Sequence, residues 1–183
     1  RRHEMRHMWA VAKGLGTLMG KGQMTKDVQR AFHAKGIRGG HLEAALLRRF
    51  FARIQKQRLA DVETIDPSTL DPRLRERFVR AKANLEKENP RLREKARGEM
   101  AQLLVVNDVK QILDSSPRPK PEFDKQATPP TREQREAWHK QMGAHYQRIG
   151  EQVRSKWPEA YKQTQAELAK VATSADELTD WVE

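Results

Sequence analysis

Cysteine is absent from the 183-residue chain. Its absence excludes disulfide bonds, zinc sites built on thiolates and catalysis by a cysteine nucleophile. A chain without cysteine is compatible with the cytosol, the nucleus or an organelle matrix. Long apolar runs are absent too, because none approaches the roughly 18–20 residues that a helix needs to cross a bilayer. We therefore expect neither a disulfide framework nor a transmembrane segment.

Apolar side chains are scarce, at 37% of the residues, while charged side chains reach 33%. Typical globular domains are about 45–50% apolar and about 25% charged. A chain this polar has little apolar surface to bury against itself. It is therefore partly disordered when alone, or it is ordered by its neighbours. We expect it to be part of a large assembly.

Acidic side chains are nearly missing from the first third of the chain. There, 14 lysines and arginines stand against 3 acids, and the net charge of +11 equals that of the whole protein. Residues 61–120 carry +2 and residues 121–183 carry −2. This asymmetry predicts a basic region that contacts a polyanion and a near-neutral remainder that contacts protein. The alternative is that the excess positive charge only keeps the chain soluble.

Alternating strand patterns are missing, whereas apolar residues recur at helical spacing through most of the chain. We predict a short helix over residues 25–35, ended by Gly36, and a longer, well-buried helix over residues 41–59. An aspartate or asparagine followed by proline, at 71–72 and 89–90, is typical of a helix start. These elements predict an all-α fold.

Proline is concentrated in one segment, because five of the nine prolines lie between residues 115 and 130. Proline at that density fits neither a helix nor a central strand, so we predict an extended, semi-rigid linker there. Thr131 and Gln134 then match the capping box of a new helix. We predict helices from that point to the C-terminus, with an interruption at Pro158.

Glycine is concentrated as well, since seven of the ten glycines lie between residues 14 and 40. Glycine raises the entropic cost of order, so we expect a flexible arm unless a partner holds it. The whole chain is then an extended helical protein with four parts. These are a basic, glycine-rich arm with one short helix (1–40), a helical body (41–114), the proline-rich linker (115–130) and the C-terminal helices (131–183).

Positive side chains of the arm and of the following helix are candidates for phosphate contacts. Such contacts set the position of a nucleic acid without reading its bases. For the cations of residues 48–58, the alternative is an ordinary solvated helix face. We expect rRNA or another polyanion to bind through residues 1–60, with contacts from Arg1, Arg2, Arg6, Lys13, Lys21, Lys26, Arg38, Arg48, Arg49, Arg53, Lys56 and Arg58.

Large aromatic and sulfur-containing side chains mark the C-terminal helices. Because this segment is slightly acidic, we expect these side chains to pack in the core or against protein and not on bases. Neighbouring protein subunits are therefore the partners that we predict for residues 131–183. The contacts are expected from Trp138, Met142, Tyr146, Trp157 and Trp181.

Three motif matches lack the context that their chemistry requires. Residues 3–7 match the H-E-x-x-H pattern of zinc metalloproteases, but no upstream strand or core supports it. Residues 16–22 contain Gly-Lys without the hydroxyl residue that follows it in a phosphate loop. A helix-turn-helix outline over residues 24–58 has a loose, glycine-rich turn and a mostly apolar second helix, unlike a DNA reader. We predict no enzyme, no cofactor and no metal site.

Charge segregation without a catalytic cluster predicts a structural, RNA-contacting subunit of a ribonucleoprotein. Residues 1–22 combine five bases with one acid and scattered apolar residues, as a matrix-targeting segment or an rRNA-binding tail does. We therefore expect a mitochondrial ribosomal protein in the matrix, with the cytoplasm as the alternative location. The alternative function is a helical accessory subunit of a mitochondrial respiratory or ATP-synthase complex, with the basic arm on anionic lipid or acidic subunits. A protein associated with an acidic filament is a third possibility.

Overall fold

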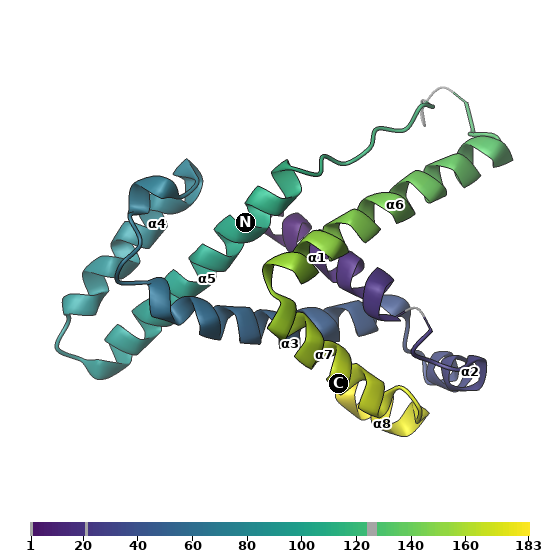
Figure 1. The fold of residues 1–183 in the computed structure, drawn as a ribbon, viewed down its shortest axis with the longest axis horizontal. Helices are drawn as coiled ribbons and strands as arrows, with labels where there is room; N and C mark the ends of the chain where they lie inside the picture. Colours follow the sequence, from purple (N-terminus) through teal and green to yellow (C-terminus); the bar gives the residue numbers. More distant parts are fainter. Residues whose placement is uncertain (1, 21, 124–127) are drawn as a thin grey trace. The chain divides into compact units, whose positions relative to one another are not determined.

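The computed structural model describes residues 2–20, 22–123 and 128–183, with side chains from Glu4 onward. These residues are helical with no strand among them, which confirms the predicted all-α class. Short 3-10 turns at Leu59–Asp61, Pro67–Thr69 and Asn84–Glu86 join some of the helices. The α-helices are α1 (Arg2–Gly20), α2 (Lys26–Ala34), α3 (Gly39–Arg58), α4 (Pro72–Ala83), α5 (Pro90–Asp114), α6 (Arg132–Lys156), α7 (Pro158–Val171) and α8 (Ala175–Val182) (Figure 1).

Two compact units make up the chain. Unit 1 comprises Arg1–Leu47 and Ile112–Glu183, and unit 2 comprises Arg48–Gln111. Helices α3 and α5 each begin in one unit and end in the other. The domain limits predicted at residues 40, 114 and 130 stay predictions, although each falls at or beside a helix end.

Helix α1 replaces the flexible arm that the glycine content led us to expect. It packs against α6 and buries one face completely, with Val11, Leu15 and Met19 at 0% exposure. The predicted flexibility depended on nothing holding the arm, and here α6 holds residues 2–20, because the burial of this apolar face offsets the entropic cost of the glycines. The predicted short helix is confirmed as α2, which begins after the Thr25 cap.

Two glycines let α1 and α6 approach each other closely. A Cβ atom added to Gly14 would lie 2.9 Å from the backbone nitrogen of Gly150. A Cβ atom added to Gly150 would lie 2.6 Å from the carbonyl oxygen of Gly14. Because a side chain on either residue would collide with backbone, these positions require glycine for packing and not for flexibility.

The proline-rich segment is confirmed as non-helical over its described residues, 115–123 and 128–130. Its first part is attached to α6, because Gln152 Nε2 donates a hydrogen bond of 2.9 Å to the Oγ atom of buried Ser116. The next helix begins at the predicted capping box. Gln134 N donates to Thr131 Oγ1 at 3.1 Å, and Thr131 N donates to Gln134 Oε1 at 2.9 Å.

Unit 2 places the most apolar stretch of α5 in its interior. Residues 103–106 are buried and remain helical. The starts of α4 and α5 are capped as predicted. Asp71 accepts a hydrogen bond of 3.0 Å from the backbone nitrogen of Arg73, and Asn89 accepts one of 3.0 Å from that of Arg91.

Candidate nucleic-acid interface

Predicted cations of unit 1 lie on the surface of the first two helices and the turn that follows. Arg6 and Lys13 are exposed on α1, Lys26 is exposed at the start of α2, and Arg38 is exposed just before α3. Lys13 also lies over the ring of Tyr146, with Nζ 5.1 Å from the ring centroid. Arg1, Lys21 and the side chain of Arg2 lie outside the described residues.

A cluster of three arginines follows on the part of α3 that belongs to unit 2. Arg48 is exposed, whereas Arg49 and Arg53 are half-buried. Burial lowers the pKa of the Arg49 guanidinium, and the positive charges of Arg48 and Arg53 lower it further. The positive charges of the three side chains thus act on one another along this part of α3. Lys56 is exposed one turn further along the helix.

The guanidinium of Arg58 is occupied by two carboxylates inside unit 2. Its Nε donates to Asp108 Oδ2 at 2.9 Å and its Nη2 to Asp108 Oδ1 at 3.1 Å. Its Nη1 donates to Asp61 Oδ2 at 2.6 Å. Asp108 is only 4% exposed, so the geometry describes a bidentate structural ion pair. We therefore remove Arg58 from the candidate phosphate contacts.

Helix α4 is a basic surface that sequence reasoning missed. Its 12 residues contain five basic side chains and one acid, and Arg73, Arg80 and Lys82 are exposed. Glu76 pairs with Arg80, and Arg75 Nε donates to the carbonyl oxygen of Leu70 at 2.8 Å. The signal was present in the local composition, but averaging the charge over residues 61–120 hid it.

The structure separates the predicted protein-interface residues into two groups. Trp157 is buried at the junction of α6 and α7, with 6% exposure, which agrees with the first of the two predicted roles, packing in the core. Trp138, Met142, Tyr146 and Trp181 are half-buried, and for them a protein interface remains a prediction. Sequence reasoning also missed large exposed apolar side chains, which are Met5 at 63%, Trp9 at 43%, Val79 at 52% and Leu92 at 45%.

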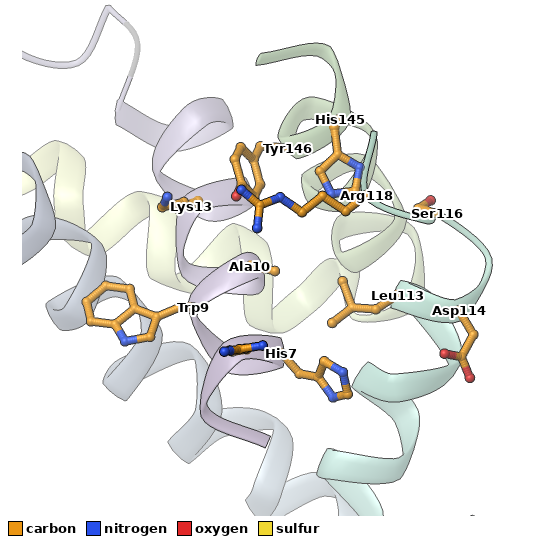
Figure 2. A pocket seen from close by; sticks show the side chains of 11 residues that line it. His7, Trp9, Ala10, Lys13, Leu113, Asp114, Ser116, Arg118, His145 and Tyr146 are labelled. Carbon is orange, nitrogen blue, oxygen red and sulfur yellow. The ribbon is translucent and has the colours of Figure 1, made fainter. Parts of the chain in front are cut away.

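A pocket of about 650 Å³ lies within unit 1, where α1, the end of α5, the start of the linker and α6 meet. Its wall is mostly basic and aromatic, with Asp114 as the one carboxylate in it. Figure 2 shows Lys13 from α1 near the ring of Tyr146, and Arg118 from the linker near His145 of α6. The side chains that matter most for its chemistry are Arg6, Trp9, Lys13, Arg118, His145 and Tyr146.

His145 is the unusual group of this pocket. The residue is 4% exposed, and its Nδ1 atom is buried without a hydrogen-bond partner. Burial lowers the pKa of the His145 imidazole, and the positive charges of Arg148 and Arg118 lower it further. The ring is therefore neutral near pH 7, with a polar nitrogen that an entering oxygen-bearing group could satisfy.

The described residues offer no site for a metal ion, because no three histidine or carboxylate side chains among them gather to hold one. His3 of the H-E-x-x-H match has its side chain outside the described residues. None of the helices in the described ranges is both long and apolar enough to span a bilayer. Comparisons with protein-family models, curated proteins and solved structures returned no match. The function must therefore be argued from the residues of this chain.

Proposed function

We propose that this protein is a non-enzymatic, RNA-binding structural subunit of a ribonucleoprotein. The observation that carries the proposal is the cluster of Arg48, Arg49 and Arg53 on α3. These three arginines lie within six residues of one helix, and guanidinium groups bind phosphate oxygens with matching geometry. Other exposed cations, on α1, α2 and α4, would extend the contact along a phosphate backbone.

RNA suits this charge distribution better than a compact anionic ligand does. Within unit 1 the exposed cations lie on α1, on α2 and just before α3, so a long polyanion suits them better than a small anion does. We propose a mitochondrial ribosome as the particle and the matrix as the location. The support for this step is the composition of residues 1–22, which is typical of matrix-targeting segments and of rRNA-binding tails alike.

A second candidate function is an accessory subunit of a respiratory or ATP-synthase complex. The specific observation in its favour is the exposed pair Met5 and Trp9, one helical turn apart on α1. Exposed apolar side chains beside an exposed cation, Arg6, suit a contact with another subunit or an anionic lipid surface. This function predicts that the protein sediments with a membrane complex and not with ribosomes.

A salt titration of RNA binding tests the first proposal. The full-length protein is titrated with a fluorescent RNA hairpin between about 50 and 200 mM salt, and the slope of log K against log salt is measured. The double variant Arg48→Gln/Arg53→Gln should lower the slope by about 1.8 for duplex RNA, close to 0.9 for each lost phosphate contact. Arg→Gln retains most of the aliphatic stem, so the helix should persist.

The matched control removes two exposed lysines from the C-terminal segment, Lys162→Gln and Lys170→Gln. Because both lysines lie on α7, which carries no proposed RNA contact, the control should keep the salt slope of the unmodified protein. Equal slopes for the two double variants would contradict the proposal. Sucrose-gradient sedimentation of a lysate at low salt then distinguishes the ribosome from a respiratory complex as the parent particle.

A further inference from the structure

We propose that the pocket between α1, the linker and α6 binds one unpaired nucleotide of a single-stranded RNA, with the phosphate beside Lys13, Arg118 and His145 and the base on Trp9. This inference rests on the proposed RNA-binding function and specifies the form of RNA that unit 1 recognises. The pocket volume of about 650 Å³ lies within the range of roughly 300–1,000 Å³ that is usual for ligand sites.

Charge is the first argument for a phosphate. Three cations line the pocket, Arg6, Lys13 and Arg118, against the single carboxylate of Asp114. They come from two separate segments, and Figure 2 shows Lys13 of α1 and Arg118 of the linker on either side of the Tyr146 ring region of the pocket. Such an arrangement favours a ligand that carries negative charge on several oxygens, as a phosphate group does.

The buried nitrogen of His145 is the second argument, and it is independent of the net charge. His145 is more than nine-tenths buried, and its Nδ1 has no partner within the protein. A neutral imidazole can donate from one ring nitrogen, so a phosphate oxygen that enters the pocket could accept a hydrogen bond there. An unsatisfied buried polar atom is uncommon in a folded protein, and a bound ligand explains it.

The aromatic side chains provide the third argument. Trp9 is 43% exposed, which leaves part of its ring surface open at the rim of the pocket. Tyr146 is half-buried and already holds Lys13 over its ring, so it positions the cation and leaves Trp9 as the open platform. Bases stack on such rings only when they are unpaired, which selects single-stranded RNA over duplex.

The close crossing of α1 and α6 fixes the position of these groups. Gly14 follows Lys13 directly, and a Cβ atom on Gly14 would lie 3.1 Å from the carbonyl oxygen of Tyr146. Lys13 and Tyr146 therefore sit beside a backbone contact that leaves little freedom to shift. A site held this way is preorganised, which reduces the entropic cost of binding.

The test compares a fluorescent 12-nucleotide oligouridylate with an RNA hairpin whose two strands are joined by a polyethylene glycol linker, so that it has no unpaired base, using fluorescence anisotropy on the full-length protein. Trp9→Leu should weaken oligouridylate binding by about 5- to 100-fold, the usual effect of one stacked base, and leave the salt slope unchanged. Trp9→Phe should retain most of the affinity because it retains an aromatic ring. Hairpin binding should be the same for both variants as for the unmodified protein.

Arg118→Gln should also weaken oligouridylate binding, and it should lower the salt slope by about 0.7, the value for one phosphate contact on a single strand. The matched control is Lys120→Gln, which removes the same charge from an exposed linker position that does not line the pocket. Because the linker is extended at both positions, neither change is expected to alter the helix content measured by circular dichroism.

Each outcome separates the pocket from the general RNA-binding surface. If Trp9→Leu leaves oligouridylate affinity unchanged, or weakens the hairpin equally, the pocket assignment is overturned while the α3 result stands by itself. If the α3 double variant leaves the salt slope unchanged but the pocket variants weaken oligouridylate binding, the proposed role of α3 in RNA binding is contradicted. The assignment of the pocket to an unpaired nucleotide is then retained. Uridine monophosphate binding as tightly as the 12-mer would overturn the assignment to an RNA chain.

Discussion

The two units of this protein use charge in different ways. Unit 2 holds 16 basic and 10 acidic side chains, a net charge of +6, and pairs several of them across its interior. Unit 1 holds 20 basic and 15 acidic side chains, a net charge of +5, and its interior depends on apolar contacts and on a close helix crossing. The excess positive charge of the first 60 residues is thus divided between two different environments.

This difference shows that a cation's sequence position does not reveal its role. Arg58 was predicted to contact phosphate together with other cations of α3, but its guanidinium holds Asp108 in a bidentate ion pair. The charges that Arg58 and Asp108 pair inside unit 2 are structural, whereas RNA contacts are proposed only for cations on the surface. The predictions below test this division, beginning with the largest expected effect.

Replacing Arg58 should destabilise unit 2 more than it affects RNA binding. Arg58→Met removes the bidentate partner of Asp108, whose side chain is 5% exposed. Breaking one side of such a buried pair should lower the free energy of unfolding by about 2–4 kcal/mol, measured by urea denaturation. The salt slope for an RNA hairpin should remain that of the unmodified protein, because Arg58 contacts carboxylates and not phosphates.

The control for this change is the double variant Arg58→Met/Asp108→Leu. Removing both charges should recover part of the lost stability, because no buried charge is then left with a missing partner. If Arg58→Met instead keeps full stability and lowers the salt slope, Arg58 belongs with the RNA contacts and the distinction drawn within α3 is wrong.

Adding a methyl group at the helix crossing should destabilise unit 1. The Cβ atom of Gly150→Ala would lie 2.6 Å from the carbonyl oxygen of Gly14, so α1 and α6 must move apart. Overpacking of this kind costs about 1–3 kcal/mol. Hydrogen exchange should locate the effect, with faster exchange of the α1 and α6 amides and little change in those of α4.

Gly143→Ala is the matched control on the same helix. A Cβ atom at Gly143 meets nothing within 4 Å, so alanine should stabilise α6 by up to about 1 kcal/mol through its higher helix propensity. If both alanine variants stabilise the protein alike, α1 does not pack on α6 as described, and the flexible arm expected from the sequence would be restored.

Local chemistry made much of this fold predictable. The capping box of Thr131 with Gln134 and the Asp71-Pro72 start each place a helix end through contacts within three residues. The proline-rich linker was equally visible, because proline restricts the backbone whatever surrounds it. Features of this kind need no knowledge of the rest of the chain.

Features that depend on distant residues were not predictable. From the sequence, Gly14 was interpreted as a source of flexibility. Glycine is required there by the backbone of Gly150, which is far away in the sequence. Arg58 was interpreted as a surface cation because its partner Asp108 is 50 residues away in the sequence. The pocket could not be predicted for the same reason, since Lys13, Arg118 and His145 are brought together only in the folded chain.

Acid should weaken unit 1 selectively, which gives the smallest of the three effects. All six histidines lie in unit 1 and none in residues 48–111. The folded-state pKa of His145 is lowered, mainly by burial and then by Arg148 and Arg118. As the pH falls, His145 is therefore protonated in the unfolded chain before it is protonated in the folded protein. The free energy of unfolding thus decreases as the pH drops below about 6.5, the pKa of histidine in an unfolded chain.

His145→Gln removes this contribution, and comparison with the unmodified protein cancels the other titrating groups. Between pH 7.5 and pH 5.5 the variant should lose less thermal stability than the unmodified protein, measured as the change in Tm by circular dichroism. A bound oligouridylate should reduce the acid sensitivity of the unmodified protein, because a phosphate beside His145 favours the protonated ring. Identical pH profiles for the two proteins would show that His145 has the same pKa in the folded and the unfolded chain. That result would contradict the argument that the pocket contains an unsatisfied His145 nitrogen.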